Sequence, residues 1–568
     1  AEMKRANRQK KFGLVFEEHL PECTPLYDVP IRIGAKVALK TGYVSDIYTV
    51  LNINGDEVQC DRRETHEHKA FKLDELVTVA EFGEAIYPTL KPLDSVENAP
   101  DSGLWHTLIE ADNYHALQLL EYLYAEKVDC IYIDPPYNTG GKDFKYDDTF
   151  IDEKDGFRHS KWLSFMYERL KLARDLLKDS GVIFISIDDN EMAQLKLLCD
   201  EIMGINNFVG MILWKKKTNG NNMGWLPPVH DYILCYSKSV ESIFDMGYDL
   251  SEQDIMSKYS NPDNDPRGPW TTTDLSANHV GPYFMITNPK TGESFYPPEG
   301  RYWVFNENEV NKRIEDGRII FGKSGNARPV QRVFAKDRDI SKRKAESWWD
   351  KQGMNSDATK ELKDIFGVAK VFTHPKPVEL LCNIIKIACA KDAIILDFFA
   401  GSGTTAQAVL ELNKEDGGQR KFILCTNNEN NICEEITYQR VKTVITGKRQ
   451  DGSEYSEGIP ANVKYYHTDF VPKSEEYLAD SLLNHVTEMI QLEHGVRIDD
   501  DSYIIIMSDD EADELERKWN EYTDIKAIYV SQDVLLTASQ EALFGSVDTY
   551  IIPDYYFNFE LREAGELW

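Results

Sequence analysis

Strand-like apolar runs that alternate with amphipathic helices constrain the fold of this chain most. The runs VDCIYI and GVIFISI are separated by the helical segment WLSFMYERLKLARDLL, and the pattern resumes later with PVELLCNIIKIACA, AIILDFF, TTAQAVLELN and KFILCTNN. Continuously apolar strands with helices between them are typical of parallel sheets that are covered on both faces. We therefore expect an α/β fold whose sheet is built from two separated stretches of chain.

The remaining segments have different patterns. Residues 29–94 contain short β-type runs and the turn Asn54-Gly55-Asp56, which favours a small β-barrel-like module. Residues 239–370 are rich in Pro, Gly, Asn and aromatic residues, with irregular strands, as in an insertion. We expect a helical lead over 1–28, the α/β core over 95–238 and 371–465, and an acidic α/β domain over 466–568.

The net charge of −32 at first argues against a nucleic-acid partner, because the phosphate backbone favours Lys and Arg. The charge is unevenly spread, however. Residues 471–568 hold 6 basic and 23 acidic side chains, whereas Arg318 to Lys344 holds 9 basic and 2 acidic ones. This basic strip is compatible with DNA binding, and an ordinary solvated face is the alternative.

The sequence has no signature of membrane insertion, secretion or a metal site. The apolar stretches are too short for a membrane span, and the start lacks the apolar segment of a secretory signal. The nine cysteines form no CxxC pair and no cluster with histidines. We expect a cytoplasmic protein with reduced thiols, no metal and no membrane association. The start at Ala1-Glu2 suggests that the natural chain begins earlier.

The first motif with chemical meaning follows the strand CIYI and consists of Asp134, Pro135, Pro136 and Tyr137. Ligands of α/β enzymes bind at the carboxyl ends of parallel strands. A carboxylate and the carbonyl of Pro135 could each accept one N–H of an exocyclic base amine, which would free the delocalised lone pair of the nitrogen. Tyr137 offers a face on which an extruded base could stack. A plain Pro-Pro turn with a surface aspartate is the alternative.

The second motif, Asp397 to Thr404 with the sequence DFFAGSGT, lies between the strand AIIL and a helix. Glycines at 401 and 403 would let the backbone approach a ligand at the helix N-terminus. A tight strand-to-helix turn without a ligand is the alternative for this motif alone.

With the long segment between them, the two motifs resemble those of the β-class DNA amino-methyltransferases, particularly the modification subunits of type III restriction systems. The resemblance covers Leu104 to Asn430 and includes IEADNYHAL, SKWLSFMYERL, DPRGPW and THPKPVELL. It implies a Rossmann-like S-adenosylmethionine-dependent methyltransferase sheet, with residues 239–370 as a target-recognition domain. The implied reaction is methyl transfer to N6 of a flipped-out adenine, as part of restriction-modification or phage defence.

The resemblance also implies which residues hold S-adenosylmethionine. The glycine turn would surround the methionine part, with Asp397 ordering that loop, and Lys376 with Pro377 would begin a helix that helps to hold the amino-acid moiety. Asp112 and Asn113 would lie near the adenosine, and Glu429 would contact the ribose. The expected set is Asp112, Asn113, Lys376, Asp397, Phe399, Ala400, Gly401, Ser402, Gly403, Thr404 and Glu429.

DNA contacts are expected near both ends of the insertion and within it. Each basic candidate could equally be a solubilising charge, so the group carries more weight than any member. The candidates are Lys215, Lys216, Lys217, Arg267, Trp270, Arg328, Arg332, Lys342, Arg343 and Lys344.

Other interpretations remain. Gly317 to Ser324 matches the phosphate-loop pattern GxxxxGK[ST], but its strand-like interior disfavours an ATP site. Methylation of cytosine C5 is disfavoured, since the sequence has no Pro-Cys dipeptide. A cytosine-N4 methyltransferase, or a DNA-binding specificity subunit with little catalysis of its own, stays open.

Double-stranded DNA is the expected partner, together with a second copy of the chain or a helicase-nuclease subunit.

Overall fold

The computed structural model of the chain describes residues 23–26, 30–40, 46–63, 65–81, 86–140, 145–146, 149–150, 152, 154–219, 225–243, 246–251, 253, 257–322, 325–337, 342–472, 477–496, 498 and 502–566. It forms two compact units. The larger unit combines Ala1–Phe244 with Glu346–Trp568, and the smaller unit is the inserted segment Asp245–Ala345.

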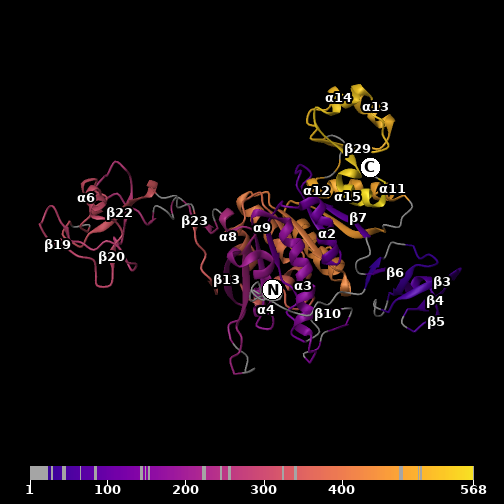
Figure 1. Cartoon of the computed structure of the whole chain (residues 1–568), viewed down its shortest axis with the longest axis horizontal. Helices are drawn as coiled ribbons and strands as arrows, with labels where there is room; N and C mark the ends of the chain where they lie inside the picture. Colours follow the sequence, from indigo (N-terminus) through magenta and orange to yellow (C-terminus); the bar gives the residue numbers. More distant parts are fainter. Residues whose placement is uncertain are drawn as a thin grey trace, which may run out of the picture. The chain divides into compact units, whose positions relative to one another are not determined.

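A ten-stranded sheet forms the centre of the larger unit (Figure 1). Its order is β24 (Trp348–Trp349), β13 (Phe208–Lys215), β14 (His230–Ser237), β12 (Leu177–Ile187), β9 (Val128–Ile133), β25 (Ile394–Asp397), β26 (Lys421–Thr426), β8 (Trp105–Glu110), β27 (Asn462–Pro472) and β7 (Ile86–Glu97). The six strands from β12 to β27 are parallel, which confirms the α/β sheet expected from the sequence. Antiparallel strands β14 and β7 extend it on either side.

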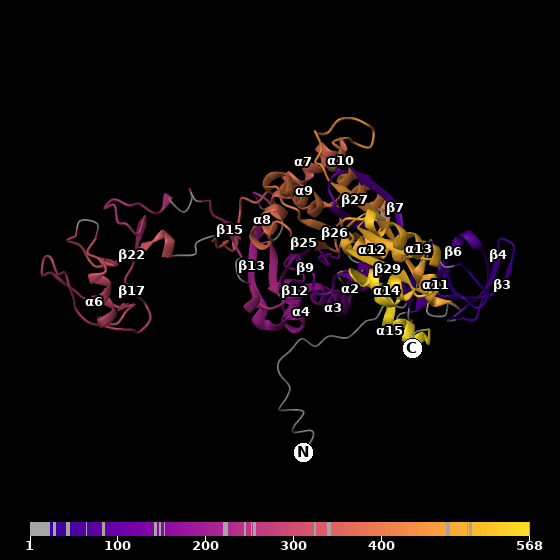
Figure 2. The same cartoon turned by 90° about the horizontal axis from the view of Figure 1, so that it is seen from above.

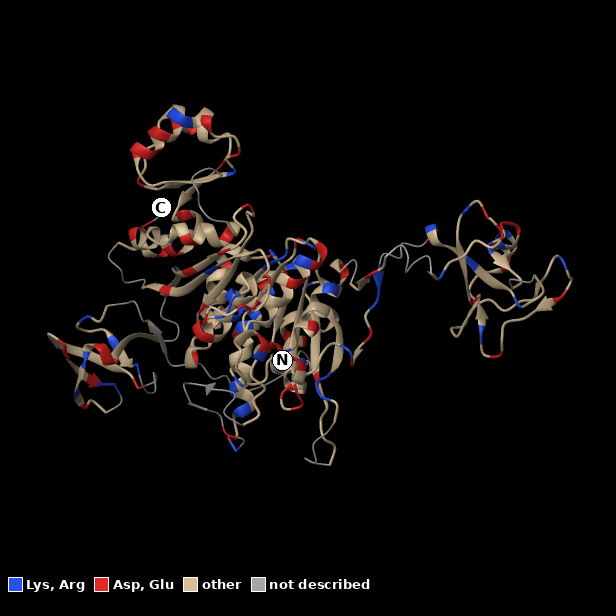
Figure 3. Cartoon of the chain, turned by 180° about the vertical axis from the view of Figure 1, so that it is seen from behind, with Lys and Arg blue, Asp and Glu red and all other residues tan. Residues whose placement is uncertain are grey.

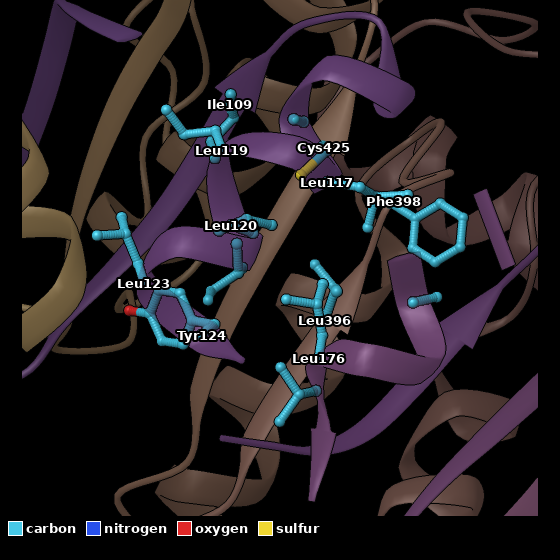
Figure 4. Close-up of a cluster of buried hydrophobic side chains, with 14 of the residues drawn as sticks. Ile109, Leu117, Leu119, Leu120, Leu123, Tyr124, Leu176, Leu396, Phe398 and Cys425 are labelled. Atoms are coloured by element: carbon cyan, nitrogen blue, oxygen red, sulfur yellow. The ribbon is translucent and has the colours of Figure 1, made fainter. Parts of the chain in front are cut away.

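Two helix layers cover this sheet (Figure 2). One layer contains α2 (Asn113–Tyr124), α3 (Arg158–Leu176) and α4 (Met192–Cys199), and the other contains α7 (Asn355–Phe366), α8 (Val378–Ala388), α9 (Thr404–Asp416) and α10 (Gln439–Thr446). Leu117 and Leu120 of α2 lie in one buried cluster with Leu396 of β25 and with Phe398 (Figure 4). The core therefore extends directly beneath the turn that follows β25.

The N-terminal module is a six-stranded antiparallel sheet. Its strands are β1 (Cys23–Leu26), β6 (Leu76–Glu81), β2 (Lys36–Leu39), β3 (Tyr48–Asn54), β4 (Glu57–Arg62) and β5 (His68–Lys72), in that order. The helix expected over 1–28 is wrong at 23–26, because these residues pair with β6 as a strand. Residues 1–22 and 27–29 lie outside the described residues.

In the described residues, the inserted unit contains short strands and the helix α6 (Glu307–Glu315). The strands are β15 (Tyr248–Asp249), β16 (Trp270–Thr273), β17 (Ser276–Ala277), β18 (Ile286–Thr287), β19 (Ser294–Phe295), β20 (Tyr302–Trp303), β21 (Ile319–Ile320), β22 (Val330–Phe334) and β23 (Lys342–Arg343). The segment GRIIFG contains strand β21, while Lys323 and Ser324 lie outside the described residues.

The inserted unit is shorter than the insertion expected over 239–370. The compact unit comprises Asp245–Ala345. Beyond that point, β24 pairs with β13 and helix α7 packs against α10. Residues 346–370 therefore belong to the unit that contains the large sheet.

The C-terminal region carries a second, three-stranded parallel sheet. Its strands are β28 (Tyr503–Ile506), β29 (Ala527–Ser531) and β30 (Asp548–Ile552), and its helices are α11 (Leu478–Leu483), α12 (Val486–His494), α13 (Asp509–Lys518), α14 (Ala538–Phe544) and α15 (Asp554–Ala564). Tyr529 and Phe557 join the main core, and acidic side chains cover α13 (Figure 3). None of the helices in the described ranges combines the length and apolar character that a membrane span requires.

Candidate active site

The two motifs singled out in the sequence follow neighbouring strands. Asp134 comes directly after β9, and Asp397 is the last residue of β25. The strands are parallel partners, with Ile131 opposite Leu396. Because parallel strands end at the same edge of a sheet, the two turns lie side by side in one unit.

Lys376 links the two turns. Its Nζ lies 2.5 Å from Oδ2 of Asp134, and its backbone carbonyl accepts a hydrogen bond of 3.2 Å from the hydroxyl of Thr404. The lysine is buried and Asp134 is half-buried. A buried carboxylate is costly without a partner, so the ammonium offsets the charge that Asp134 brings to this edge.

The Asp-Pro-Pro-Tyr turn presents two hydrogen-bond acceptors, the Asp134 carboxylate and the Pro135 carbonyl. The Tyr137 hydroxyl donates to Oδ1 of Asp134 at 2.9 Å, and the indole N–H of Trp162 donates to the carbonyl of Pro136 at 2.7 Å. Within the described ranges, no hydrogen bond to the carbonyl of Pro135 is found. A carboxylate oxygen has lone pairs for more than one donor, so Asp134 can accept a further N–H beside that carbonyl.

The residue after the turn, Asn138, was not predicted from the sequence. It is buried in the left-handed region at φ 56°, and its amide donates to Oε1 of Glu191 at 2.6 Å. Nδ1 of His159 lies 2.7 Å from the same oxygen, and burial raises the pKa of Glu191. The turn is thus tied to the start of α3 and to the segment before α4. Asparagine tolerates this conformation better than most residues, which is the only signal that the sequence offers.

The glycine bend is ordered by Asp397. This carboxyl accepts hydrogen bonds from the backbone N–H of Phe399 at 3.0 Å and from the hydroxyl of Thr405 at 2.5 Å. Burial raises the pKa of Asp397 to about 7, and the nearby charge of Asp134 acts in the same direction. Gly403 directly precedes α9 at φ 77°, where a Cβ would lie 3.2 Å from the side chain of Thr437.

A buried arginine supports the same bend from behind. Arg440, in α10, donates from Nη1 to the hydroxyls of Ser402 at 3.1 Å and Thr404 at 2.8 Å, and from Nε to the side chain of Gln407 at 2.9 Å. Burial lowers its pKa to about 10. No sequence pattern indicates this contact, because Arg440 belongs to no motif and is remote in the chain.

Asp112 and Asn113 reach the site from the start of α2. Asn113 donates to the carbonyl of Phe398 at 3.0 Å, and Arg169 contacts both residues, with 2.5 Å to Oδ1 of Asn113 and 3.1 Å to Asp112. The Arg169 guanidinium also lies 3.8 Å from the ring centre of Phe165. Arg169 is a further residue that the sequence did not indicate.

Glu429, the expected ribose contact, lies farther along the sheet edge. It begins the short helix η6 (Glu429–Asn431) after β26, the strand next to β25, and it is exposed. In the described part of the chain, no group of three or more His, Cys, Asp or Glu could hold a metal ion.

Several of the expected DNA contacts already have partners. Lys216 pairs with the buried Asp231 at 2.5 Å. Arg332 pairs with Asp263 at 2.7 Å and with Asp265 at 3.0 Å, and it lies 4.1 Å from the ring centre of Trp270. The buried Trp270 donates to Asp263 at 2.8 Å. These side chains stabilise the fold locally and are poor candidates for phosphate contacts.

The other candidate DNA contacts differ in how far the side chain is exposed to solvent. Arg267 pairs with Asp265 at 2.8 Å and is likewise a poor candidate. Exposed candidates are Arg328, Arg343 and Lys344, and half-buried ones are Lys215, Lys217 and Lys342.

Comparisons with known proteins find related sequences. The family described as DNA methylase matches residues 128–439. The Mod subunit of the type III restriction-modification enzyme StyLTI from Salmonella typhimurium is 38% identical over 390 residues, which cover 63% of this chain and 58% of that protein. The EcoPI Mod subunit of Escherichia phage P1 is 34% identical over 449 residues, which cover 66% of this chain and 67% of that protein.

The solved structures that match are more distant. A putative DNA modification methylase from Thermus thermophilus, complexed with S-adenosyl-L-methionine, is 15% identical, with a TM-score of 0.29 over 59% of this chain and 96% of that one. The chain spans 58% of the length of the StyLTI Mod subunit, so that protein contains regions without a counterpart in the match.

Proposed function

Since this chain belongs to the DNA methylase family, we propose that it methylates the exocyclic amine of a base in double-stranded DNA, with S-adenosylmethionine as the methyl donor. The observation that carries the proposal is the pair of acceptors at the end of β9. The Asp134 carboxylate and the Pro135 carbonyl directly follow β9, and β9 pairs with β25, the strand that leads into the glycine bend. One turn can therefore hold the amine while the other holds the donor.

The chemistry proposed for the first turn is activation of a weak nucleophile. Asp134 accepts one N–H of the amine and the Pro135 carbonyl accepts the other, which draws the nitrogen towards a tetrahedral geometry and frees its lone pair. Asp134 then receives the proton that the nitrogen loses when its new bond to carbon forms. Tyr137, whose hydroxyl is fixed on Asp134, offers its ring to the extruded base.

The second turn is proposed to hold S-adenosylmethionine, which supplies an electrophilic methyl group when bound. The residues fit this group. Gly401 has no side chain, and a Cβ there would come within 3.2 Å of Phe372. The first N–H groups of α9 suit the carboxylate of an amino acid. The residues proposed to line this cofactor are Asp112, Asn113, Lys376, Asp397, Phe399, Ala400, Gly401, Ser402, Gly403, Thr404 and Glu429.

The target is proposed to be N6 of adenine, and the setting a restriction-modification system. The StyLTI and EcoPI relatives carry the names of type III Mod subunits, which supports the restriction-modification setting and fits the proposed target. We further propose that the inserted unit recognises the DNA sequence. It holds 15 basic and 15 acidic residues between 245 and 345, so it is far less acidic than the chain as a whole.

The direct test is methyl transfer by the purified full chain. Unmethylated genomic DNA is incubated with S-adenosylmethionine that carries a labelled methyl group, and the digested nucleosides are separated by mass spectrometry. We expect labelled N6-methyldeoxyadenosine from the wild type and none from Asp134→Ala. Label in N4-methyldeoxycytidine would instead identify cytosine as the target base. Binding of DNA and cofactor without transfer would instead support a specificity subunit and overturn the proposed enzyme.

A further inference from the structure

A second feature of the same sheet edge is the loop that joins β13 to β14. In this antiparallel pair, Lys215 at the end of β13 lies opposite His230 at the start of β14. Strand β14 also pairs with β12, where Tyr232 lies opposite Ile187. Because β12 runs parallel to β9, its carboxyl end lies at the edge that carries Asp134. The loop between Lys216 and Val229 therefore leaves the sheet at the catalytic edge.

The root of this loop is fixed. The backbone N–H of Lys216 donates to the carbonyl of Val229 at 3.0 Å, and its carbonyl accepts from the N–H of Asn355 at 3.0 Å. The Lys216 ammonium pairs with Asp231. Burial raises the pKa of Asp231, and the charge of Asp134 acts on it in the same direction. The loop thus begins within electrostatic reach of the residue that is proposed to hold the amine.

Two large apolar side chains of the loop lie in water. Trp225 is 102% exposed and Leu226 is 91% exposed, and no other large apolar side chain in the described ranges is as exposed as Trp225. Exposing an indole next to a leucine is unfavourable without a partner. Pro227 and Pro228 follow directly and restrict the backbone of Leu226, which lowers the conformational entropy that this residue loses on binding.

The charge around this pair indicates the kind of partner. No Asp or Glu lies between Ile202 and His230 in a chain whose net charge is −32, and Lys215 and Lys217 flank Lys216, whose own charge is paired with Asp231. Lysines around an apolar tip suit a surface that is negative outside and apolar within. A DNA duplex has this character, with phosphates outside and stacked bases inside.

We propose that Trp225 and Leu226 enter the DNA duplex at the position that the target base leaves, and stack on the neighbouring bases. The inference rests on the proposed function, because extrusion of a base creates the gap that a wedge fills. An indole is suited to this place, since its face stacks on any base and imposes little sequence preference. The pair would thereby hold the duplex open while Asp134 holds the amine.

The test uses duplexes that carry the methylated site, which sequencing of DNA modified by the wild type identifies. In one duplex the target adenine is paired with thymine, and in the other it faces an abasic position, so that extrusion is already easy. For Trp225→Ala with Leu226→Ala we expect kcat/KM on the paired duplex to fall about tenfold or more, as loss of base stacking implies. On the abasic duplex it should return to within about threefold of the wild type.

The matched control is Leu535→Ala with Phe559→Ala, which removes an exposed aliphatic and an exposed aromatic side chain, 81% and 68% exposed, from the C-terminal region. It should match the wild type on both duplexes. Equal loss on both duplexes by the loop variant, or no loss on either, would overturn the wedge. So would a wild-type oligomer that the loop variant alone dissociates, since the pair would then face protein. A wild type that methylates neither duplex would overturn the proposed function itself.

Discussion

Three charged residues, Asp134, Lys376 and Asp397, meet at the edge of two adjacent strands. The ammonium of Lys376 is bonded to Asp134, while Asp397 is turned into the glycine bend. Burial raises the pKa of Asp397 to about 7. The site therefore keeps one carboxylate paired for the amine and allows the other to be partly protonated near neutral pH.

The titration of Asp397 predicts a pH-dependent stability. A raised pKa in the folded chain means that its stabilising contribution is fully present below about pH 4 and is lost as the pH rises through about 7. Asp397→Asn removes this dependence. The unfolding free energy of the wild type, relative to that of the variant, should therefore fall between pH 5 and pH 8 by up to about 3 kcal/mol. Calorimetry at both pH values measures it.

The control for this prediction is Asp350→Asn, which changes an exposed carboxylate in the same unit. Its melting temperature relative to the wild type should not depend on pH over this range. A pH-independent difference for Asp397→Asn as well would mean that Asp397 is ionised in the folded protein throughout the range.

The sequence reveals site residues that lie together in a short motif, but not those that reach the site from distant parts of the chain. Asp134 and Gly403 could be predicted because each lies in a short motif after an apolar strand. Arg440 and Arg169 could not, because their hydrogen bonds to Thr404 and Asn113 join residues that are far apart in the chain. The pair of Lys216 with Asp231 could not be predicted either, since nothing in the sequence indicates this buried partner.

At the scale of elements, helix α9 depends on how it begins and ends. Gly403 precedes it and Gly417 follows it, and both have left-handed backbone conformations, with φ of 77° and 68°. A Cβ at Gly403 would meet Thr437 at 3.2 Å, whereas a Cβ at Gly417 would meet nothing within 4 Å. A substitution at Gly417 therefore adds backbone strain alone, whereas a substitution at Gly403 adds backbone strain and crowding against Thr437.

We expect Gly403→Ala to weaken S-adenosylmethionine binding and Gly417→Ala to leave it unchanged. Each variant should lose about 1 kcal/mol of stability from the left-handed backbone, and Gly403→Ala should lose more because Thr437 must move. Titration calorimetry gives the affinities and thermal melting gives the stabilities. Equal affinities for the two variants would show that the bend does not shape the cofactor site.

The parallel strands and their helices could be predicted, since burial on both faces leaves an unbroken apolar run. Strand β7 could not, since its residues were expected partly in the N-terminal module, over 29–94, and partly in the α/β core from 95. It contains Pro88 and Pro92 and many polar residues, which favour a loop in the sequence. It forms the outermost strand beside β27, where a proline can face away from the ladder.

At the scale of the whole molecule, the inserted unit begins and ends at neighbouring points. Strand β15 pairs with β23, so Tyr248 lies opposite Arg343. A Cβ at Gly247 would come within 2.5 Å of the Arg343 carbonyl, which shows how closely the two ends approach. The unit also has its own core, with Leu275, Ile286 and Trp303. Such a unit can be removed with little strain on the chain that remains.

Replacing residues 250–341 with a short Gly-Ser linker is therefore expected to preserve the cofactor site and abolish methylation of DNA. The affinity for S-adenosylmethionine should stay within about threefold, a change of less than about 1 kcal/mol. Calorimetry and the labelled-methyl assay measure the two properties. If the shortened chain still methylated the same sequence, recognition would have to lie in the unit with the large sheet.

We propose that one sheet edge holds the amine and the methyl donor on adjacent turns. Cofactor affinity and single-turnover methyl transfer, measured together in Asp134→Ala and in the isosteric Asp134→Asn, separate the two functions of this edge. Asp188→Ala, which changes a carboxylate directly after the neighbouring strand β12, is the control. We expect both Asp134 variants to bind S-adenosylmethionine nearly as the wild type does but to transfer methyl at least about 100-fold more slowly. Transfer at the wild-type rate by either Asp134 variant would show that this carboxylate does not activate the amine.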